Sequence, residues 1–312
     1  MSRFSPALRA VARRPMAFGA AMTSSARPFH TSPAARNAAA ASRPVPGILP
    51  EMSLKDKVII VSGGARGLGL VQAEALMEAG ATVHAVDILP SPENDPKSEY
   101  FAVAQRAKHE LGSKLHYHQS DVRDVPGLNK IVEGITNKEG RLDGLIAAAG
   151  INHETPALEY SGEEVDRMLG INVKGAFVTA QAVARQMIRL QCKGSICMIA
   201  SMSAAVANKG MTAPLYNPSK AAVVQLAKNL AMEWGPHGIR VNTISPGYIV
   251  TAMTEALFDV FPERREAWAK DNMLGRLSMP KEYRGAAVFL LSDASSFMTG
   301  GDLRIDGGHT AW

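Results

Sequence analysis

The chain has 312 residues, of which 46% are hydrophobic and 20% charged, and this suits one large or two small globular α/β domains. Its net charge of +5 is unevenly spread, because residues 1–50 hold seven arginines and no acidic residue. Subtracting these seven from the 34 basic residues leaves 27 against 29 acidic ones, a net charge of −2. The basic balance therefore indicates no nucleic-acid partner, and no run of 18 or more apolar residues predicts a membrane span.

The basic leader is the first element in chain order. Residues 1–36 are rich in arginine, serine and alanine and lack acids, which is typical of a mitochondrial transit peptide. We expect a mature chain that starts near Asn37 in the mitochondrial matrix; an extension without a targeting role would leave the protein in the cytoplasm. Residues 37–52, with three prolines, read as a linker. Cys192 and Cys197 suit two reduced thiols, and we predict no metal site.

From residue 53 onward, short apolar runs alternate with helical stretches. Predicted strands cover residues 58–61, 82–86, 114–118, 142–148, 195–200, 240–245 and 302–305. Predicted helices begin near residues 67, 96, 125, 161, 212, 262 and 281. This alternation predicts one α/β catalytic domain at 53–312, a Rossmann-type doubly wound parallel sheet of about seven strands with helices on both faces. Ligands should bind at the carboxyl ends of the strands.

A glycine-rich turn, SGGARGLG at 62–69, follows the first predicted strand and opens a helix. Gly63 permits a tight turn, Gly67 lets the backbone approach a pyrophosphate, and Gly69 allows the helix to pack closely. The backbone N–H groups from Gly67 and Leu68 onward and the positive end of the helix dipole favour phosphate. The order strand, turn, helix predicts a dinucleotide site.

Two residues near this turn bear on the choice of cofactor. Asp87 ends the second predicted strand, where a carboxylate can hold the ribose hydroxyls of NAD and repel the 2′-phosphate of NADP. Arg66 lies inside the turn and could instead meet that phosphate. We weigh Asp87 more heavily, so NAD is the favoured cofactor and NADP remains open.

Tyr216 and Lys220 are four residues apart, so on a helix they share one face. A free phenol loses its proton only near pH 10. A fixed positive charge beside it lowers its pKa, and a tyrosine tuned in this way can exchange a proton with a substrate oxygen near neutral pH. The pair therefore predicts an acid/base site.

From residue 54 to the end, the chain resembles the short-chain dehydrogenase/reductase family. The resemblance rests on the ordered motifs SGGARGLG at 62–69, Asp121-Val122, AAAG at 147–150, Asn172, Ser203, Tyr216 with Lys220, and PGYIVT at 246–251. It implies that Tyr216 is the acid/base, that Ser203 polarises the reacting oxygen, and that Lys220 binds the nicotinamide ribose. Ser203 is preferred to Ser201 because the family's usual serine lies thirteen residues before the tyrosine.

The resemblance also implies several supporting contacts. Asn172 would anchor a water in a proton relay from Lys220. The remaining positions would contact the cofactor: Asp121 and Val122 at adenine, Gly150 by its backbone, and Ile249 and Thr251 at the carboxamide. The family usually has Asn-Asn-Ala-Gly where this chain has Ala147-Ala148-Ala149-Gly150, which puts the hydrogen bonding of the central strands in doubt.

The substrate is less sharply indicated. The loops after the later strands offer Asn152, His153, Glu154 and Tyr248, which suit a polyhydroxylated small molecule or are ordinary loop polarity. His153 has no second histidine at a metal-binding spacing. The stretches PALEYS, ASMSA, ISPGYI and DLRIDGGHTAW resemble fungal polyol and sugar dehydrogenases of the D-arabinitol type, which implies interconversion of a secondary alcohol and a ketone.

Two alternatives stay open. One is a mitochondrial 3-oxoacyl-thioester reductase, which should prefer NADPH and present a basic surface, such as Arg185, Arg189, Lys193 and Lys228, to an acyl-carrier protein. The other is a dehydrogenase-like scaffold that binds a partner without turnover. The resemblance further implies a homotetramer or homodimer, with helices near 165–190 and 212–234 at the interfaces.

Overall fold

The computed structural model describes residues 49–312, apart from the side chain of Met253. The predicted transit peptide at 1–36 and most of the predicted linker at 37–52 lie outside the described residues. The last three residues of that linker form a short 3₁₀ turn, Pro50–Met52.

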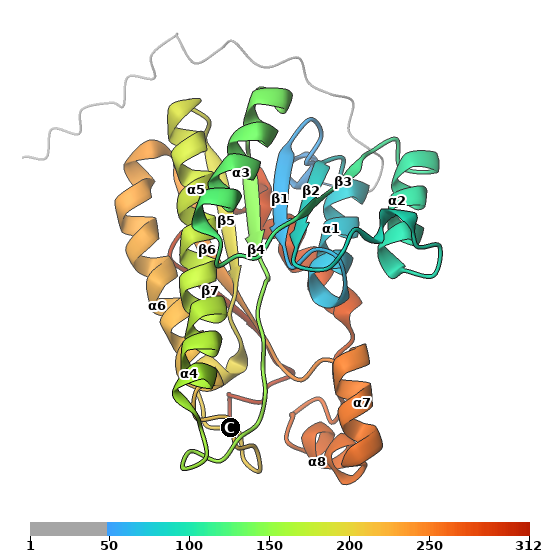
Figure 1. The fold of residues 1–312 in the computed structure, drawn as a ribbon, viewed down its shortest axis with the longest axis vertical. Coiled ribbons are helices and arrows are strands. Elements are labelled where there is room, and N and C mark those ends of the chain that lie inside the picture. The colour runs from blue at the N-terminus through green and yellow to red at the C-terminus, as the bar shows by residue number, and fades with distance from the viewer. Residues whose placement is uncertain (1–48) are drawn as a thin grey trace, which may run out of the picture. The chain divides into compact units, whose positions relative to one another are not determined.

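A seven-stranded parallel sheet forms the centre of the described domain, in the order β3-β2-β1-β4-β5-β6-β7 (Figure 1). The strands are β1 (Val58–Ser62), β2 (Thr82–Asp87), β3 (Leu115–Gln119), β4 (Gly144–Ala147), β5 (Gly194–Ile199), β6 (Ile239–Pro246) and β7 (Asp302–Ile305). Each overlaps one of the seven predicted strands. The predicted doubly wound α/β fold is confirmed.

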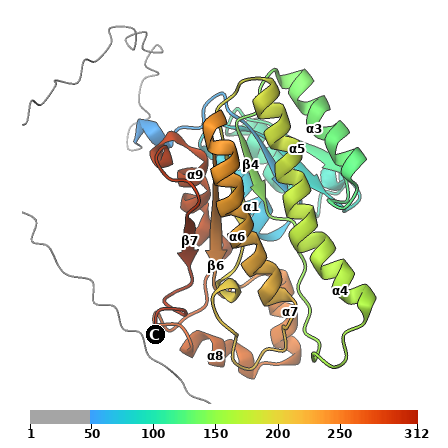
Figure 2. The same ribbon diagram turned by 90° about the vertical axis from the view of Figure 1, so that its left-hand side faces the viewer.

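Helices cover both faces of this sheet. They are α1 (Gly67–Glu78), α2 (Glu99–His109), α3 (Val125–Glu139), α4 (Gly162–Leu169), α5 (Ala176–Arg189), α6 (Tyr216–Trp234), α7 (Ala252–Val260), α8 (Glu263–Lys270) and α9 (Arg284–Leu291). One apolar cluster joins the sheet to α3, α5 and α6, and a second joins the other face to α1 and α9. Figure 2 shows α5 and α6 side by side along one face.

The strand order reverses at β1, which pairs with β2 on one side and with β4 on the other. Chain connections leave such a point in opposite directions, so a crevice opens beyond the carboxyl ends of these two strands. The glycine turn follows β1 directly, and the segment containing Gly150 follows β4. The topology therefore brings these two predicted parts of the site together.

The helices differ from prediction in three places. The helix expected near 212 begins at Tyr216, because Pro214 disfavours the helical conformation for the residue before it. The helix expected through 165–190 is interrupted by a π-helical turn at Gly170–Gly175. Helix α7 was not predicted; it begins at Ala252, directly after Thr251, whose side chain caps it. Among the described residues, no helix is both long and apolar enough to span a bilayer.

Candidate active site

The glycine turn has the geometry that its sequence predicts. Gly63 has φ +69°, and a Cβ there would lie 2.8 Å from the backbone nitrogen of Ala149. A Cβ on Gly69 would collide with the carbonyl oxygen of Gly63, so helix α1 packs directly on the turn. Gly67 has φ +56° and faces open space. The turn therefore offers exposed backbone at the start of α1, where a phosphate is best bound.

The alanines that replace the usual asparagines leave the backbone pairing intact. Ala148 donates its N–H to the carbonyl of Ser62 at 3.1 Å, so β1 and β4 stay connected at the site. The close approach of Gly63 to Ala149 fixes the turn against this segment. The alanines Ala147 and Ala148 therefore do not disrupt the backbone hydrogen bonding between β1 and β4.

Asp87 is buried at the end of β2 and is tied to the turn. Its carboxylate accepts hydrogen bonds from the backbone N–H of Ala65 at 3.1 Å and of Leu89 at 3.3 Å. Two of its roughly four lone-pair sites are then used, so it can also accept from a ribose. Arg66 precedes α1 in extended conformation and is exposed. Both residues border the predicted cofactor site.

Asp121 and Val122 already have structural partners. Arg123 forms a two-pronged pair with Asp121, with a contact of 2.6 Å, and this hydrogen bonding lowers the pKa of the carboxyl. Val122 is buried against Gly175, where a Cβ would lie 2.6 Å from the valine side chain. Contact with adenine stays a prediction for both residues.

Tyr216 and Lys220 lie at the start of α6, as their spacing predicts. The ammonium lies 5.7 Å from the centroid of the Tyr216 ring. It is 5% exposed and donates to the carbonyl of Ile199, at the end of β5, at 2.8 Å. A Cβ on Gly150 would lie 3.5 Å from the same nitrogen. Lys220 therefore joins α6 to the carboxyl ends of β4 and β5.

The ionisation of this pair differs from expectation. Burial raises the pKa of Tyr216, with an opposing hydrogen bond from Ser201. Burial lowers the pKa of Lys220 to about 8. The predicted lowering of the tyrosine pKa by Lys220 is therefore wrong in this structure, because desolvation of the phenol outweighs any attraction between the phenolate and the ammonium. The phenol is protonated at neutral pH.

Of the two serines, Ser201 is the one whose hydroxyl acts on the Tyr216 phenol in this structure, whereas the resemblance favours Ser203, and the role of either serine at the substrate oxygen stays a prediction. Ser201 follows β5 and hydrogen-bonds the Tyr216 side chain, and its oxygen also accepts from the backbone N–H of Ser203 at 3.2 Å. Among the described residues, no hydrogen bond joins Ser203 to Tyr216. Ser201 directly follows the carboxyl end of β5, and this position, rather than the number of residues before the tyrosine, brings its hydroxyl to the phenol.

Asn172 is buried in the π-helical turn between α4 and α5. Its amide exchanges two 2.9 Å hydrogen bonds with the backbone of Ile151 and donates to the Ser219 hydroxyl at 3.0 Å. Such single π turns are common at functional sites. The asparagine braces the segment after β4 against α6, and its role in a water relay stays a prediction.

Ile249 and Thr251 follow β6. Ile249 forms an isolated parallel bridge with Ser278, and the Thr251 hydroxyl accepts from the backbone N–H of Thr254 at 3.3 Å. The threonine thus starts α7. Contact of these two residues with a carboxamide stays a prediction.

The four substrate candidates have different surroundings. Asn152 is exposed, and His153 lies 3.7 Å from Glu164. The carboxylate of Glu154 forms a two-pronged pair with Arg264 of α8, at 2.6 and 3.1 Å, with both side chains 19% exposed. Glu154 therefore has a charged partner, Arg264, that no local sequence pattern predicts.

The ring of Tyr248 is buried and stacks on Trp268, with centroids 4.3 Å apart and planes 7° apart. Burial raises the pKa of Tyr248 to about 12, so its hydroxyl stays protonated. Asn208 donates to this hydroxyl at 3.5 Å. Tyr248 therefore helps to hold the Asn208 side chain in place.

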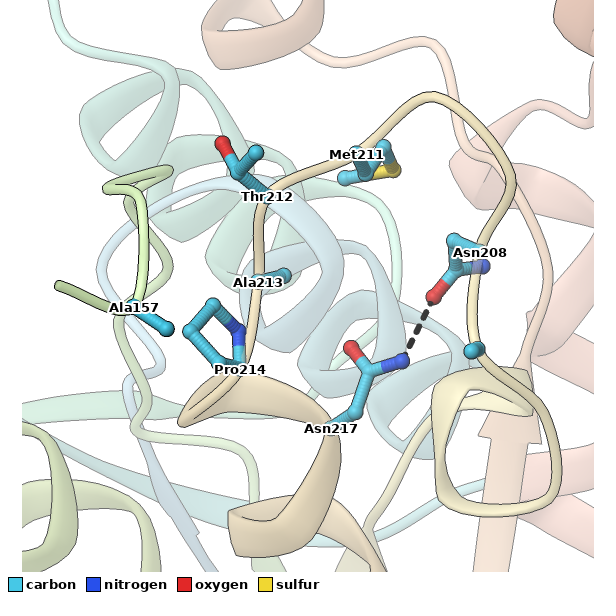
Figure 3. Close-up of a pocket in the computed structure, with 8 residues that line it drawn as sticks. Ala157, Asn208, Met211, Thr212, Ala213, Pro214 and Asn217 are labelled. Carbon is cyan, nitrogen blue, oxygen red and sulfur yellow. Dashed lines mark hydrogen bonds between the residues drawn. The ribbon is translucent and has the colours of Figure 1, made fainter.

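A pocket of about 340 Å³ opens beside the start of α6 (Figure 3). Its lining is mostly apolar with two amides, Asn208 and Asn217, whose side chains hydrogen-bond each other at 3.0 Å. Ala157, from the segment after β4, lies across from Pro214. Asn217, which directly follows Tyr216, was not among the residues predicted to line a substrate pocket.

Comparisons with known proteins agree with this geometry. A family model described as "Enoyl-(Acyl carrier protein) reductase" matches residues 63–310. A short-chain dehydrogenase/reductase of Aspergillus versicolor, notP', is 42% identical over 265 residues, which are 83% of this chain and 89% of that protein. The chain belongs to the short-chain dehydrogenase/reductase family. It is an oxidoreductase acting on CH–OH groups.

Other relatives in this short-chain dehydrogenase/reductase family place it close to fungal polyol dehydrogenases. D-arabinitol 2-dehydrogenase (ribulose-forming) of Candida tropicalis is 33% identical, covering 85% of this chain and 96% of the relative. A crystal structure of gluconate 5-dehydrogenase from Burkholderia cenocepacia, in complex with NADP and tartrate, has a TM-score of 0.76 and 31% identity. It covers 84% of this chain and 98% of that one.

Proposed function

We propose that this chain interconverts a polyol and a ketose, such as D-arabinitol and its ketone, with a nicotinamide dinucleotide. The observation that carries the proposal is the convergence of Tyr216, Lys220 and Ser201 beside the glycine turn, at the carboxyl edge of the sheet. The similarity to the D-arabinitol dehydrogenase supports the substrate class.

The residues present fit a dinucleotide. A Cβ at Gly63 or Gly69 would strike neighbouring backbone, so these two glycines fix the tight turn, and Gly67 leaves open space for a phosphate at the start of α1. Asp87 would hold the adenosine ribose, and Lys220 and Tyr216 the nicotinamide ribose. When bound, the nicotinamide supplies the hydride acceptor or donor.

The protein's own groups handle the proton. During ketone reduction, negative charge develops on the substrate oxygen, and the hydroxyls of Ser201 and Tyr216 can both donate to it. Tyr216 then gives its proton to that oxygen, and the positive charge of Lys220 stabilises the resulting phenolate. During alcohol oxidation the phenolate accepts the same proton.

We infer that NAD is the preferred cofactor. Asp87 supports this choice, because its buried carboxylate at the end of β2 would repel a 2′-phosphate. The NADP in the gluconate 5-dehydrogenase structure shows that this fold also accepts the phosphate in a relative, and Arg66 is the residue here that would favour it.

The test is absorbance of the reduced nicotinamide, using purified protein with NAD or NADP and a panel of pentitols, hexitols and their ketoses. NAD-dependent oxidation of a polyol supports the proposal. Tyr216→Phe is the matched control: it should lose turnover by a factor of about 10³ or more while cofactor affinity stays within about twofold. Bound cofactor without turnover on any substrate would favour the non-catalytic scaffold.

A second candidate is a 3-oxoacyl-thioester reductase. The description of the matching family model, "Enoyl-(Acyl carrier protein) reductase", favours an acyl-carrier-protein substrate, although it names an enoyl group and not a 3-oxoacyl group. It predicts NADPH-dependent reduction of a 3-oxoacyl thioester and no polyol oxidation, so the same assay separates the two candidates.

We further propose a homodimer or homotetramer. A groove of about 1320 Å³ between the α4–α5 segment and α6 includes Leu169 and Ile188, which are 39% and 38% exposed, with Phe177 and Trp234. Light scattering should give a multiple of the monomer mass. Replacing Leu169 by Glu should shift that mass towards the monomer.

The matrix location is likewise a proposal, which rests on the acid-free, arginine-rich leader. A fluorescent fusion to residues 1–50 should enter mitochondria. A fusion in which the seven arginines are changed to glutamine should not, and import of both would contradict the proposal.

A further inference from the structure

A cluster of three histidines and a glutamate lies on the β2–β3 edge of the sheet, away from Tyr216. His84 on β2 is directly opposite His116 on β3 in the strand register. His118, two residues further along β3, points to the same face. Glu139, the last residue of α3, completes the cluster. Figure 1 shows β2 and β3 at the opposite side of the sheet from β7.

The ring of His84 is the centre of this cluster. It is 1% exposed and stacks on both other rings, with centroid distances of 4.6 Å to His116 and 5.3 Å to His118. Its Nδ1 is hydrogen-bonded to Nε2 of His118 at 3.0 Å. Its Nε2 is buried with no hydrogen-bond partner and lies 3.5 Å from Oε1 of Glu139.

A buried nitrogen without a partner is costly. If the Nδ1–H of His84 donates to His118, then Nε2 carries a lone pair that faces a carboxylate oxygen, and neither atom has a proton to share. A cation between them would satisfy both. The burial of one unpaired ligand atom, aimed at a carboxylate, therefore indicates a ligand at this place.

We propose that His84, His116 and Glu139 bind one divalent transition-metal ion, with Zn²⁺ the best fit. Their ligand atoms all lie within 4.8 Å of one another. Tetrahedral Zn²⁺ with bonds of about 2.0–2.2 Å places its ligands about 3.3 Å apart. The 3.5 Å separation of His84 Nε2 and Glu139 Oε1 is close to this value, and a ligand nitrogen of His116 lies within 4.8 Å of both ligand atoms. Imidazole and carboxylate ligands suit zinc.

His118 is a positioning residue in this site. Its hydrogen bond to Nδ1 orients the His84 ring, and with His118 as the acceptor the lone pair of His84 Nε2 is presented to the metal. Partners of this kind usually change metal affinity by about 10–100-fold when they are removed. His118 should therefore matter without touching the ion.

A lysine side chain also reaches the carboxylate of this cluster. The ammonium of Lys138 lies 3.5 Å from Oε1 of Glu139, so Lys138 would compete with a metal ion for this carboxylate.

The sequence predicts no metal site because the three ligands come from separate elements without a motif. β3 is one of the two edge strands of the sheet. An ion bound by residues of β2, β3 and α3 would hold this edge strand to its neighbours. A metal ion that binds only the folded state stabilises the folded state. The site is thus structural, and it does not depend on the proposed polyol activity.

The experiment uses untagged full-length protein, stripped with a chelator, dialysed against Zn²⁺ and analysed for metal content and melting temperature. We expect one Zn²⁺ per chain and a rise in melting temperature of several degrees. His116→Gln and Glu139→Gln should each weaken binding at least about tenfold, and His118→Gln about tenfold. His237→Gln and Glu133→Gln, both at exposed positions, are the matched controls and should bind like the wild type.

Co²⁺ gives a second measurement, because a tetrahedral site produces intense visible absorption bands. These bands should appear in the wild type and be absent in His116→Gln. The proposal is overturned if the stripped protein takes up less than about half an ion per chain at micromolar Zn²⁺. Equal binding by the cluster variants and the controls would equally overturn it, since the ion would then be adventitious.

Discussion

The Ser201 hydroxyl hydrogen-bonds the Tyr216 side chain, and it does so from the end of β5 rather than from the position thirteen residues before the tyrosine. Both residues lie at the carboxyl edge of the sheet, where the Lys220 ammonium also reaches the end of β5. The proton chemistry proposed for this protein depends on this arrangement.

Ser201→Ala should lower kcat by a factor of about 10²–10³, because one donor to the developing negative charge is lost. Ser203→Ala is the matched control and should change kcat by less than about threefold. Steady-state kinetics of both variants measure the difference. If Ser203→Ala is the more damaging change, the serine that meets the substrate oxygen has been assigned incorrectly.

Lys220→Met should abolish turnover and reveal the cost of burying the lysine. A pKa lowered from 10.5 to about 8 corresponds to about 3 kcal/mol. Between these pH values the unfolded chain holds one more proton than the folded one, so the wild type gains stability as the pH rises. Below about pH 8 the lysine is charged in both the folded and the unfolded chain, so the full free-energy cost of burying the charge is present.

Urea unfolding of the wild type and of Lys220→Met, at several pH values from about 7 to about 10, measures this difference. The free energy of unfolding of the wild type should rise relative to the variant by about 1–3 kcal/mol across this range. A constant difference would mean that the lysine is not desolvated in solution.

Asp87→Asn should relax cofactor choice. The amide keeps an oxygen for the backbone N–H of Ala65 but removes the negative charge that opposes a 2′-phosphate. The ratio of kcat/KM for NAD to that for NADP should fall at least about tenfold. Asp121→Asn, at the predicted adenine contact, is the comparison and should leave the ratio near its wild-type value. An unchanged ratio in Asp87→Asn would assign cofactor choice to another group, with Arg66 the first to test.

Removing the pair between Glu154 and Arg264 should impair substrate binding more than cofactor binding. The two-pronged pair joins the segment after β4 to α8, and Thr155 in the same segment bonds to Thr212 near the pocket. Arg264→Met should raise KM for the polyol about 3–10-fold, with KM for NAD within about twofold.

The double variant Glu154→Gln with Arg264→Met should be less damaging than the sum of the two single changes, since each single change leaves one charge without its partner. Additive effects would show that the two side chains act independently. Arg265→Met, on the same helix at an exposed ion pair, is the control.

Much of the fold could be predicted from the sequence because its signals are local. Apolar runs such as the one in β1 and the glycine pattern that follows it are properties of neighbouring residues. The helix expected near 212 begins four residues later, at Tyr216, because Pro214 disfavours a helical conformation for the residue before it. The unpredicted α7 depends on a single capping threonine.

The site was only partly predictable. Tyr216 and Lys220 are one helical turn apart, so their shared face follows from helix geometry. The contact between Ser201 and Tyr216 crosses a loop of variable length, and the Glu154–Arg264 pair joins residues 110 positions apart. No local pattern encodes either contact.

The sequence by itself determined the order of strands and helices, the glycine turn and the helical acid/base pair, because each follows from backbone conformation over a few residues. Only the tertiary structure decided which serine meets the phenol, how burial shifts the pKa values of Tyr216 and Lys220, and that His84, His116 and Glu139 converge. Desolvation and contact depend on what packs around a side chain, and residues distant in the chain supply that packing.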